Sequence, residues 1–218
     1  MNGLSDRAKQ LIPKARIVSF ATWNEIAPDI IAHFQVADDE KRYLTDKDLA
    51  TIQAATDNLA ATKASAFAAV DLSATEVVAT LRDQAPDIVD EARAVVLTTF
   101  PKILEPGGGL YPPMRAEACW RDFWQFLRCI TYGIAAQQHH YTSTDGLEFM
   151  EQLYEELQVP LPAMVTGLIG VKRASLQRFP VETYPVLSPY FDHLIARLST
   201  FVKPEAEVVS STAAQAEV

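Results

Sequence analysis

Glycine, cysteine and positive charge are all scarce in this sequence. Its 218 residues include 8 Gly and 2 Cys, and 19 Lys and Arg against 28 Asp and Glu give a formal net charge of −9. Because nucleic acids and anionic membrane surfaces are bound through clustered basic residues, neither is an expected partner. Two cysteines cannot build a disulfide framework or a zinc knuckle. On one helix, Cys119 and Cys129 would lie about 15 Å apart, too far to bridge.

Long hydrophobic runs and enzyme signatures are also missing. No apolar run approaches the roughly 18 residues of a transmembrane helix, and the N-terminus lacks the apolar core of a signal peptide. We therefore expect a soluble chain that does not span a membrane. The usual nucleophile, zinc-protease, P-loop and dinucleotide motifs are absent, so no enzyme is predicted. No strand precedes the glycines at 107–109, which disfavours a phosphate loop, and His139 and His140 are expected in a surface loop.

The distribution of the remaining residues predicts an all-α fold. Long Ala- and Leu-rich stretches with so little glycine are typical of helices, and neither repeats, alternating strands nor sustained heptads occur, which favours an irregular bundle. A capping box at Thr45 to Asp48 starts a long helix. The acidic residues 38–40 are expected to form a solvated linker. The expected helices span residues 5–15, 22–35, 45–70, from 73 onward, 86–104, 114–137, 144–158, 160–177 and 187–202.

The helix around Cys119 is the candidate functional element. At about 100° per residue, Arg115, Cys119, Asp122 and Phe126 share one face, and Arg121 points away from it. A carboxylate on an apolar face needs a partner when it is buried. From spacing alone, the structural interpretation is slightly favoured over a binding site: a buried Cys119, with Asp122 paired to Arg115 or to another helix.

The order of motifs along the chain carries a resemblance to a known family. Residues 119–122 (CWRD), 127–128 (LR) and 131–136 (TYGIAA) resemble the C-x-R-D, Y-Y-L-R and T-Y-G-I-V-A motifs of the chromophore helix of phycobiliproteins, most closely the allophycocyanin α type. The resemblance extends in register over about residues 40–200. Its other matching segments are residues 42–49 (RYLTDKDL), 106–111 (PGGGLY), 159–172 (VPLPAMVTGLIGVK) and 189–195 (PYFDHLI).

The resemblance implies a fold, a domain organisation and partners. The implied fold is a globin-like phycobiliprotein helical bundle preceded by N-terminal helices. Residues 1–41 would form an N-terminal helical extension, 42–202 the globin-like domain, and 203–218 a disordered acidic tail. Through the N-terminal helices the chain would pair with a β-type phycobiliprotein subunit or with itself. A phycobilisome core or a photosystem is a further implied partner, at the cytoplasmic or stromal side of a cyanobacterial or plastid thylakoid.

The resemblance also implies a cofactor, a bilin of the phycocyanobilin type, which is a linear tetrapyrrole. Cys119 would attach it through a thioether, Asp122 would accept hydrogen bonds from the central pyrrole N–H groups, and Arg121 would pair with a propionate. Arg115 would serve the second propionate. The remaining residues implied at this site are Tyr111, Met114, Phe126 and Tyr132.

Two functions remain open from the sequence, and a third is disfavoured. The first is a bilin-carrying subunit that harvests light or passes excitation on. The alternative is a non-antenna paralogue, a regulatory, assembly or scaffold factor that docks on phycobilisomes or photosystems with or without bilin. The N-terminal extension and acidic tail motivate this alternative. A haem globin would need a proximal His between Cys119 and Tyr132, and that stretch has none.

Overall fold

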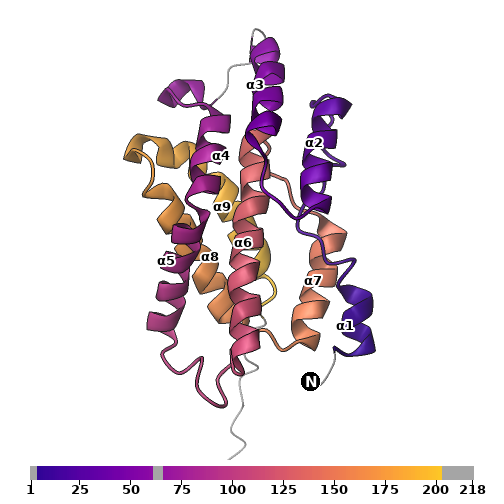
Figure 1. Cartoon of the computed structure of the whole chain (residues 1–218), viewed down its shortest axis with the longest axis vertical. Helices are drawn as coiled ribbons and strands as arrows, with labels where there is room; N and C mark the ends of the chain where they lie inside the picture. The colour runs from indigo at the N-terminus through magenta and orange to yellow at the C-terminus, as the bar shows by residue number, and fades with distance from the viewer. Residues whose placement is uncertain (1–3, 61–65, 203–218) are drawn as a thin grey trace, which may run out of the picture.

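The computed structural model describes residues 4–60 and 66–202. This part of the chain is a helical bundle with a single isolated β-bridge and no strands, which confirms the predicted all-α class (Figure 1). Its elements are α1 Asp6–Leu11, α2 Pro28–Asp39, α3 Asp46–Ala60, α4 Ala74–Asp83, α5 Ala85–Thr99, α6 Pro113–Ala135, α7 Thr144–Glu156, α8 Leu161–Leu176 and α9 Tyr184–Ser199, with short 3₁₀ helices at Ala68–Val70 and Val181–Thr183.

Helix α6 is the central element of the bundle. In Figure 1, α4, α5 and α8 lie on one side of it, α1, α2 and α7 lie on the other, and α9 passes behind it. Its buried residues, such as Phe123 and Leu127, form the middle of the core. Helix α6 can approach α8 closely because residue 167 of α8 is a glycine. A Cβ at Gly167 would lie 1.9 Å from Cζ of the Phe123 ring. This packing holds in place the helix that carries the candidate site.

Several helix boundaries differ from the sequence-based expectation. The first helix ends at Leu11. The second begins at Pro28, because proline is favoured in the first turn of a helix and disrupts a helix that starts well before it. The apolar residues before Pro28 belong to a loop, whose Trp23 packs edge-on against Phe34 with ring centroids 5.1 Å apart. The predicted helix to residue 70 is also wrong at its end, where a 3₁₀ turn occurs.

The capping box at the start of α3 is confirmed. The Asp48 amide donates to Thr45 Oγ1 at 3.2 Å, and the Thr45 amide donates to Asp48 Oδ2 at 2.9 Å. These two bonds satisfy backbone donors that a helix start leaves unpaired. Hydrogen bonds from His33, Thr45 and Arg42 hold the Asp48 carboxyl pKa well below its usual value, against the opposing effect of burial.

The prediction of a solvated linker at 38–40 is wrong for Asp38, whereas Asp39 and Glu40 are exposed. Asp38 lies in the last turn of α2 and is buried, and its Oδ1 accepts a hydrogen bond from Arg128 of α6 at 2.9 Å. One turn earlier, the Phe34 ring packs edge-on against Tyr132, with centroids 6.0 Å apart. Helix α2 is therefore folded onto α6, because a buried carboxylate is stable only beside a partner such as this guanidinium.

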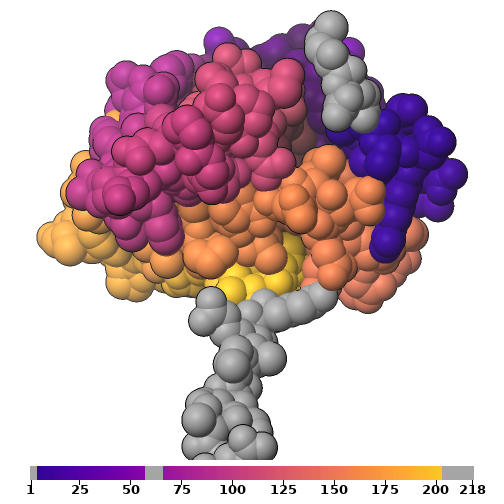
Figure 2. Space-filling view, turned by 90° about the horizontal axis from the view of Figure 1, so that it is seen from below, coloured from indigo at the N-terminus to yellow at the C-terminus, as the bar shows by residue number. Residues whose placement is uncertain are grey.

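The segment before α2 is tied to the bundle. Ala8 and Leu11 of α1 pack with Leu153 of α7, and a β-bridge joins Val18 to Thr142. In Figure 2 this indigo segment lies beside α7 at one edge of the molecule. Among the described residues, no helix is long and apolar enough to span a membrane. The expected domain boundaries stay predictions, and the tail at 203–218 lies outside the described residues.

Candidate functional site

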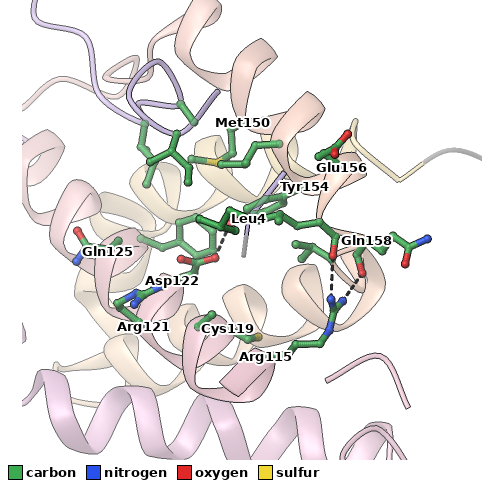
Figure 3. A pocket seen from close by; sticks show the side chains of 18 of the residues that line it. Leu4, Arg115, Cys119, Arg121, Asp122, Gln125, Met150, Tyr154, Glu156 and Gln158 are labelled. Atoms are coloured by element: carbon green, nitrogen blue, oxygen red, sulfur yellow. Dashed lines mark hydrogen bonds between the residues drawn. The ribbon is translucent and has the colours of Figure 1, made fainter. Parts of the chain in front are cut away.

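An elongated cleft of about 1140 Å³ opens along α6. One wall is α6 itself, another is α7 with the connection to α8, and the third is the N-terminal segment (Figure 3). This volume exceeds the roughly 300–1,000 Å³ typical of small-ligand pockets. From α6 the lining side chains are Met114, Arg115, Ala118, Cys119, Arg121, Asp122, Gln125, Phe126 and Arg128.

Cys119 lies at the lower end of this cleft and is almost fully buried. Its thiol donates to Met164 Sδ of α8 at 2.9 Å. Burial, with a smaller contribution from the nearby Asp122 charge, raises the pKa of the thiol to about 12. The thiol is therefore protonated at neutral pH, when it is a weak nucleophile.

Asp122 lies one turn further along α6 and faces the same cleft. Tyr154 of α7 donates to its Oδ2 at 2.9 Å, as Figure 3 shows. Within residues 4–60 and 66–202, its Oδ1 has no hydrogen-bond partner. Burial raises the pKa of this carboxyl to about 6, although the Tyr154 hydrogen bond and the Arg121 charge oppose the rise. The site thus offers a half-satisfied carboxylate to a ligand that carries N–H donors.

Arg115 binds backbone carbonyls and not Asp122. Its Nε donates to Gly109 at 3.0 Å, and its two terminal nitrogens donate to Leu157 at 3.0 Å and to Gln158 at 2.6 Å. The partner of Asp122 comes from another helix, one of the two possibilities that spacing left open. Arg115 therefore fastens the loop before α6 to the end of α7, and each of its three nitrogens is already engaged.

Arg121 lines the cleft even though helical spacing places it on a different face of α6 from Asp122. The side chain is exposed, and Figure 3 shows it on the Asp122 side of the cleft. A long, flexible side chain can reach around the helix in a way that spacing does not reveal. In the described part of the chain no hydrogen bond or ion pair holds its guanidinium, which leaves it available to an anion.

The other four predicted residues fall in different places. Met114 lines the mouth of the cleft with 62% of its surface exposed, and Phe126 lines the interior and is buried. Tyr111 is 45% exposed and is not part of the lining. Tyr132 is in the core, where its hydroxyl donates to the Arg42 carbonyl. The structure brings Met114 and Phe126 to the cleft but not Tyr111 or Tyr132.

Two groups of lining residues were not predicted from the sequence. Met150, Leu153 and Tyr154 follow the i, i+3, i+4 spacing of one α7 face, so that periodicity could have indicated a second wall. The residues of the N-terminal segment carried no such signal. They reach the cleft only because the chain folds back along α7; they are Leu4, Ser5, Ile12, Ala15, Arg16 and Ile17.

The fold and the cleft together define a globin-like helical protein whose central helix presents a thiol, a carboxylate and a guanidinium to one elongated cavity. The profile of the phycobilisome protein family matches residues 32–198, and the chain belongs to that family. The family resemblance predicted from the sequence is thereby confirmed. The match begins after the N-terminal segment, so the third wall of the cleft comes from outside it.

Individual relatives agree with the family assignment. The chain is 33% identical over 163 residues to allophycocyanin subunit alpha-B of Nostoc sp., which covers 75% of this chain and 94% of the relative. The allophycocyanin alpha-B chain of Pyropia yezoensis is 28% identical over the same length, with 75% and 94% covered. A far-red fluorescent biliprotein derived from an allophycocyanin F subunit of Chroococcidiopsis thermalis has a TM-score of 0.53 at 21% identity. It covers 58% of this chain and 96% of its own, and it supports the fold.

Proposed function

We propose that this chain binds a bilin in the α6 cleft and acts as an allophycocyanin-like subunit in light harvesting or excitation transfer. The observation that carries the proposal is the placement of Cys119 and Asp122, one turn apart on α6 and facing one cavity inside the family match. The cleft volume of about 1140 Å³ is large enough for a tetrapyrrole, and the walls are mainly apolar, apart from a carboxylate and several guanidinium groups.

A bound bilin supplies absorption of visible light. Oδ1 of Asp122 would accept N–H hydrogen bonds from the ligand, while Tyr154 holds Oδ2 and so fixes the plane of the carboxylate. Hydrogen bonds to an ionised group are about twice as strong as neutral ones, and the buried setting strengthens them further. The apolar side chains of Phe126, Met150 and Leu153 restrict torsion and exclude water from this contact. The role is therefore pigment binding and not catalysis.

Cys119 is the proposed attachment point, for a phycocyanobilin-type ligand. The thiol would add across an exocyclic C=C bond of the ligand: the S–H bond and the π bond would break, an S–C and a C–H bond would form, and no oxidant or reductant would be consumed. Because burial raises the pKa of this thiol to about 12, spontaneous attack is slow. We therefore expect efficient attachment to need a lyase that displaces the Cys119 thiol from Met164.

The proposed partners follow from the family. A β-type subunit or a second copy would pair with the N-terminal helices, and the phycobilisome core or a photosystem would receive the assembly. The place of action would be the cytoplasmic or stromal side of the thylakoid membrane, in a cyanobacterium or a plastid.

A second candidate function is a non-antenna role, as a regulatory, assembly or scaffold factor. The observation that favours it is the N-terminal segment, which lies outside the family match and forms one wall of the cleft. Affinity purification from a photosynthetic lysate separates the two roles. Stoichiometric recovery in intact antenna complexes supports the antenna role, and substoichiometric recovery with assembly intermediates supports the alternative.

The covalent claim is tested by producing the chain together with phycocyanobilin and a lyase. We expect a coloured protein that gives a zinc-dependent fluorescent band on a denaturing gel. Cys119→Ala should lose this band, and the matched control Cys129→Ala should keep it, because Cys129 is buried in α6 and does not line the cleft. A folded but colourless protein, or an unchanged band in Cys119→Ala, would contradict the proposal.

A further inference from the structure

Three cations gather at the end of the cleft away from Cys119. Arg128 lies nine residues after Cys119 on α6, about 13 Å along the helix axis. Asp38 accepts a hydrogen bond from Arg128 at 2.9 Å, and it has Arg16 at 3.4 Å and Lys41 at 3.7 Å. Asp39 adds a second carboxylate, 3.2 Å from Arg16. Three cations face two carboxylates, so this end of the cleft is net positive.

The three cations differ in how firmly they are held. Arg128 is buried against Asp38, so this pair is a fixed part of the core. Arg16 and Lys41 are half exposed, with 50% and 53% of their side-chain surface accessible, and both line the cleft. Their positive charges are the ones that a ligand can reach.

Arg16 and Lys41 also have unused donors. Both contacts of Arg16 are made by the same terminal nitrogen, Nη1, so in the described part of the chain its Nε and Nη2 have no partner. Lys41 Nζ lies 3.7 Å from Asp38, which is longer than a hydrogen bond. These donors could bind an additional anion without breaking the Asp38–Arg128 pair.

The backbone places Arg16 in the wall before any ligand arrives. The Ser143 amide donates to Ile17 at 2.8 Å, and the Ser19 amide donates to the Tyr141 carbonyl at 3.0 Å. The Arg16 carbonyl lies close against Gly146, where a Cβ would be 2.2 Å away. This side chain therefore projects from a segment that is held to α7, so ordering it costs less free energy on binding.

We propose that Arg16 and Lys41 form a carboxylate subsite for the ligand, which makes the N-terminal segment part of the binding site. The inference rests on the proposed bilin function, because a bilin carries two propionates. Arg121 is available for one of them. Arg115 is engaged with backbone carbonyls, so Arg16 and Lys41 are the cations free to bind the other.

The test compares phycocyanobilin with its dimethyl ester, in which two methyl groups remove the propionate charges. Both are titrated into the full chain carrying Cys119→Ala, so that binding is reversible, with quenching of tryptophan fluorescence as the signal. Adding Arg16→Gln and Lys41→Gln should weaken binding of the diacid about 3- to 10-fold, as expected for partly exposed charged contacts. Binding of the ester should not change. The control Lys9→Gln removes a charge from the same segment, outside the cleft, and should affect neither ligand.

Hydrogen exchange gives a second readout that does not rely on tryptophan fluorescence. The diacid should protect amides 16–19 in the Cys119→Ala chain more than the ester does, and the Gln substitutions should remove that difference. Equal weakening of both ligands, or no weakening of either, would overturn the carboxylate subsite while leaving bilin binding intact. If neither ligand binds the Cys119→Ala chain and the wild-type chain takes up no bilin, the proposed function itself fails. Should the double variant not fold, Arg16→Gln alone supports the same comparison.

Discussion

The Asp122 carboxyl should lower the stability of the ligand-free protein at neutral pH, and Asp122→Asn should therefore stabilise it. Burial raises the folded-state pKa from 3.8 to about 6. A group with a raised pKa supports folding while it is protonated, and this contribution is lost as pH rises through the folded-state pKa. The rise of about two pH units, at about 1.4 kcal/mol for each, corresponds to about 3 kcal/mol. Because the carboxyl lines an open cleft, water screens part of this cost. We therefore expect Asp122→Asn to raise the free energy of unfolding by about 1–2 kcal/mol, on the order of half the unscreened value.

Urea denaturation of the ligand-free chain at pH 4.5, 6 and 8 measures this effect. The stability advantage of Asp122→Asn over wild type should be smallest at pH 4.5 and should grow to its full value above pH 7. Asp90→Asn, which neutralises an exposed carboxylate of α5, is the matched control and should show no such growth. A stability advantage of Asp122→Asn that is constant with pH, or a wild type that is more stable than this variant at pH 8, would refute the explanation by a desolvated carboxyl. The same substitution should weaken bilin binding, because it removes the ionised acceptor.

Three further predictions concern the framework around the cleft. Gly146→Ala places a Cβ 2.2 Å from the Arg16 carbonyl. The substitution should displace the N-terminal segment and destabilise the protein by about 1–3 kcal/mol through lost backbone hydrogen bonds. Unchanged hydrogen exchange at residues 16–19 would contradict this. Gly167→Ala would meet the Phe123 ring at 1.9 Å, and we expect overpacking between α6 and α8 to cost about 1–3 kcal/mol by urea denaturation, whereas wild-type stability would show that α8 can shift freely. Burial, together with nearby His140, lowers the pKa of His193 to about 4. The stability of the folded protein should therefore fall as pH drops from 6.5 to 4, and His193→Gln should make this fall smaller. Identical pH profiles of stability for the variant and wild type would contradict this role of His193.

Much of the fold was predictable from the chain because local signals and packing agree. Scarce glycine with helical periodicity predicted the bundle, and the Thr45 capping box predicted the start of α3, which hydrogen bonds confirm. The second helix was misplaced because Trp23 continues the apolar spacing of α2 although it lies in a loop, packed against Phe34. Spacing cannot distinguish a residue on the helix from a loop residue that packs onto it.

The candidate site was only partly predictable, because half of it comes from elements distant in sequence. The family motif located Cys119 and Asp122 on one helix, which the structure places in one cleft. The roles implied for Arg115 and Tyr132 depended on side-chain directions, and the structure directs both to other backbone groups. Arg16 was beyond sequence reasoning, since only the return of the N-terminal segment along α7 brings it to the cavity. The expectation of a solvated Asp38 failed because burial was decided by Arg128, ninety residues away.

We expect this chain to carry a bilin on Cys119, held against Asp122. The most direct measurement is the visible absorption spectrum of the protein purified from its native cells, taken before and after denaturation in acidic urea. We expect a visible band that remains with the polypeptide after denaturation. A folded chain without a visible band, or a pigment that separates fully from the polypeptide, would contradict it.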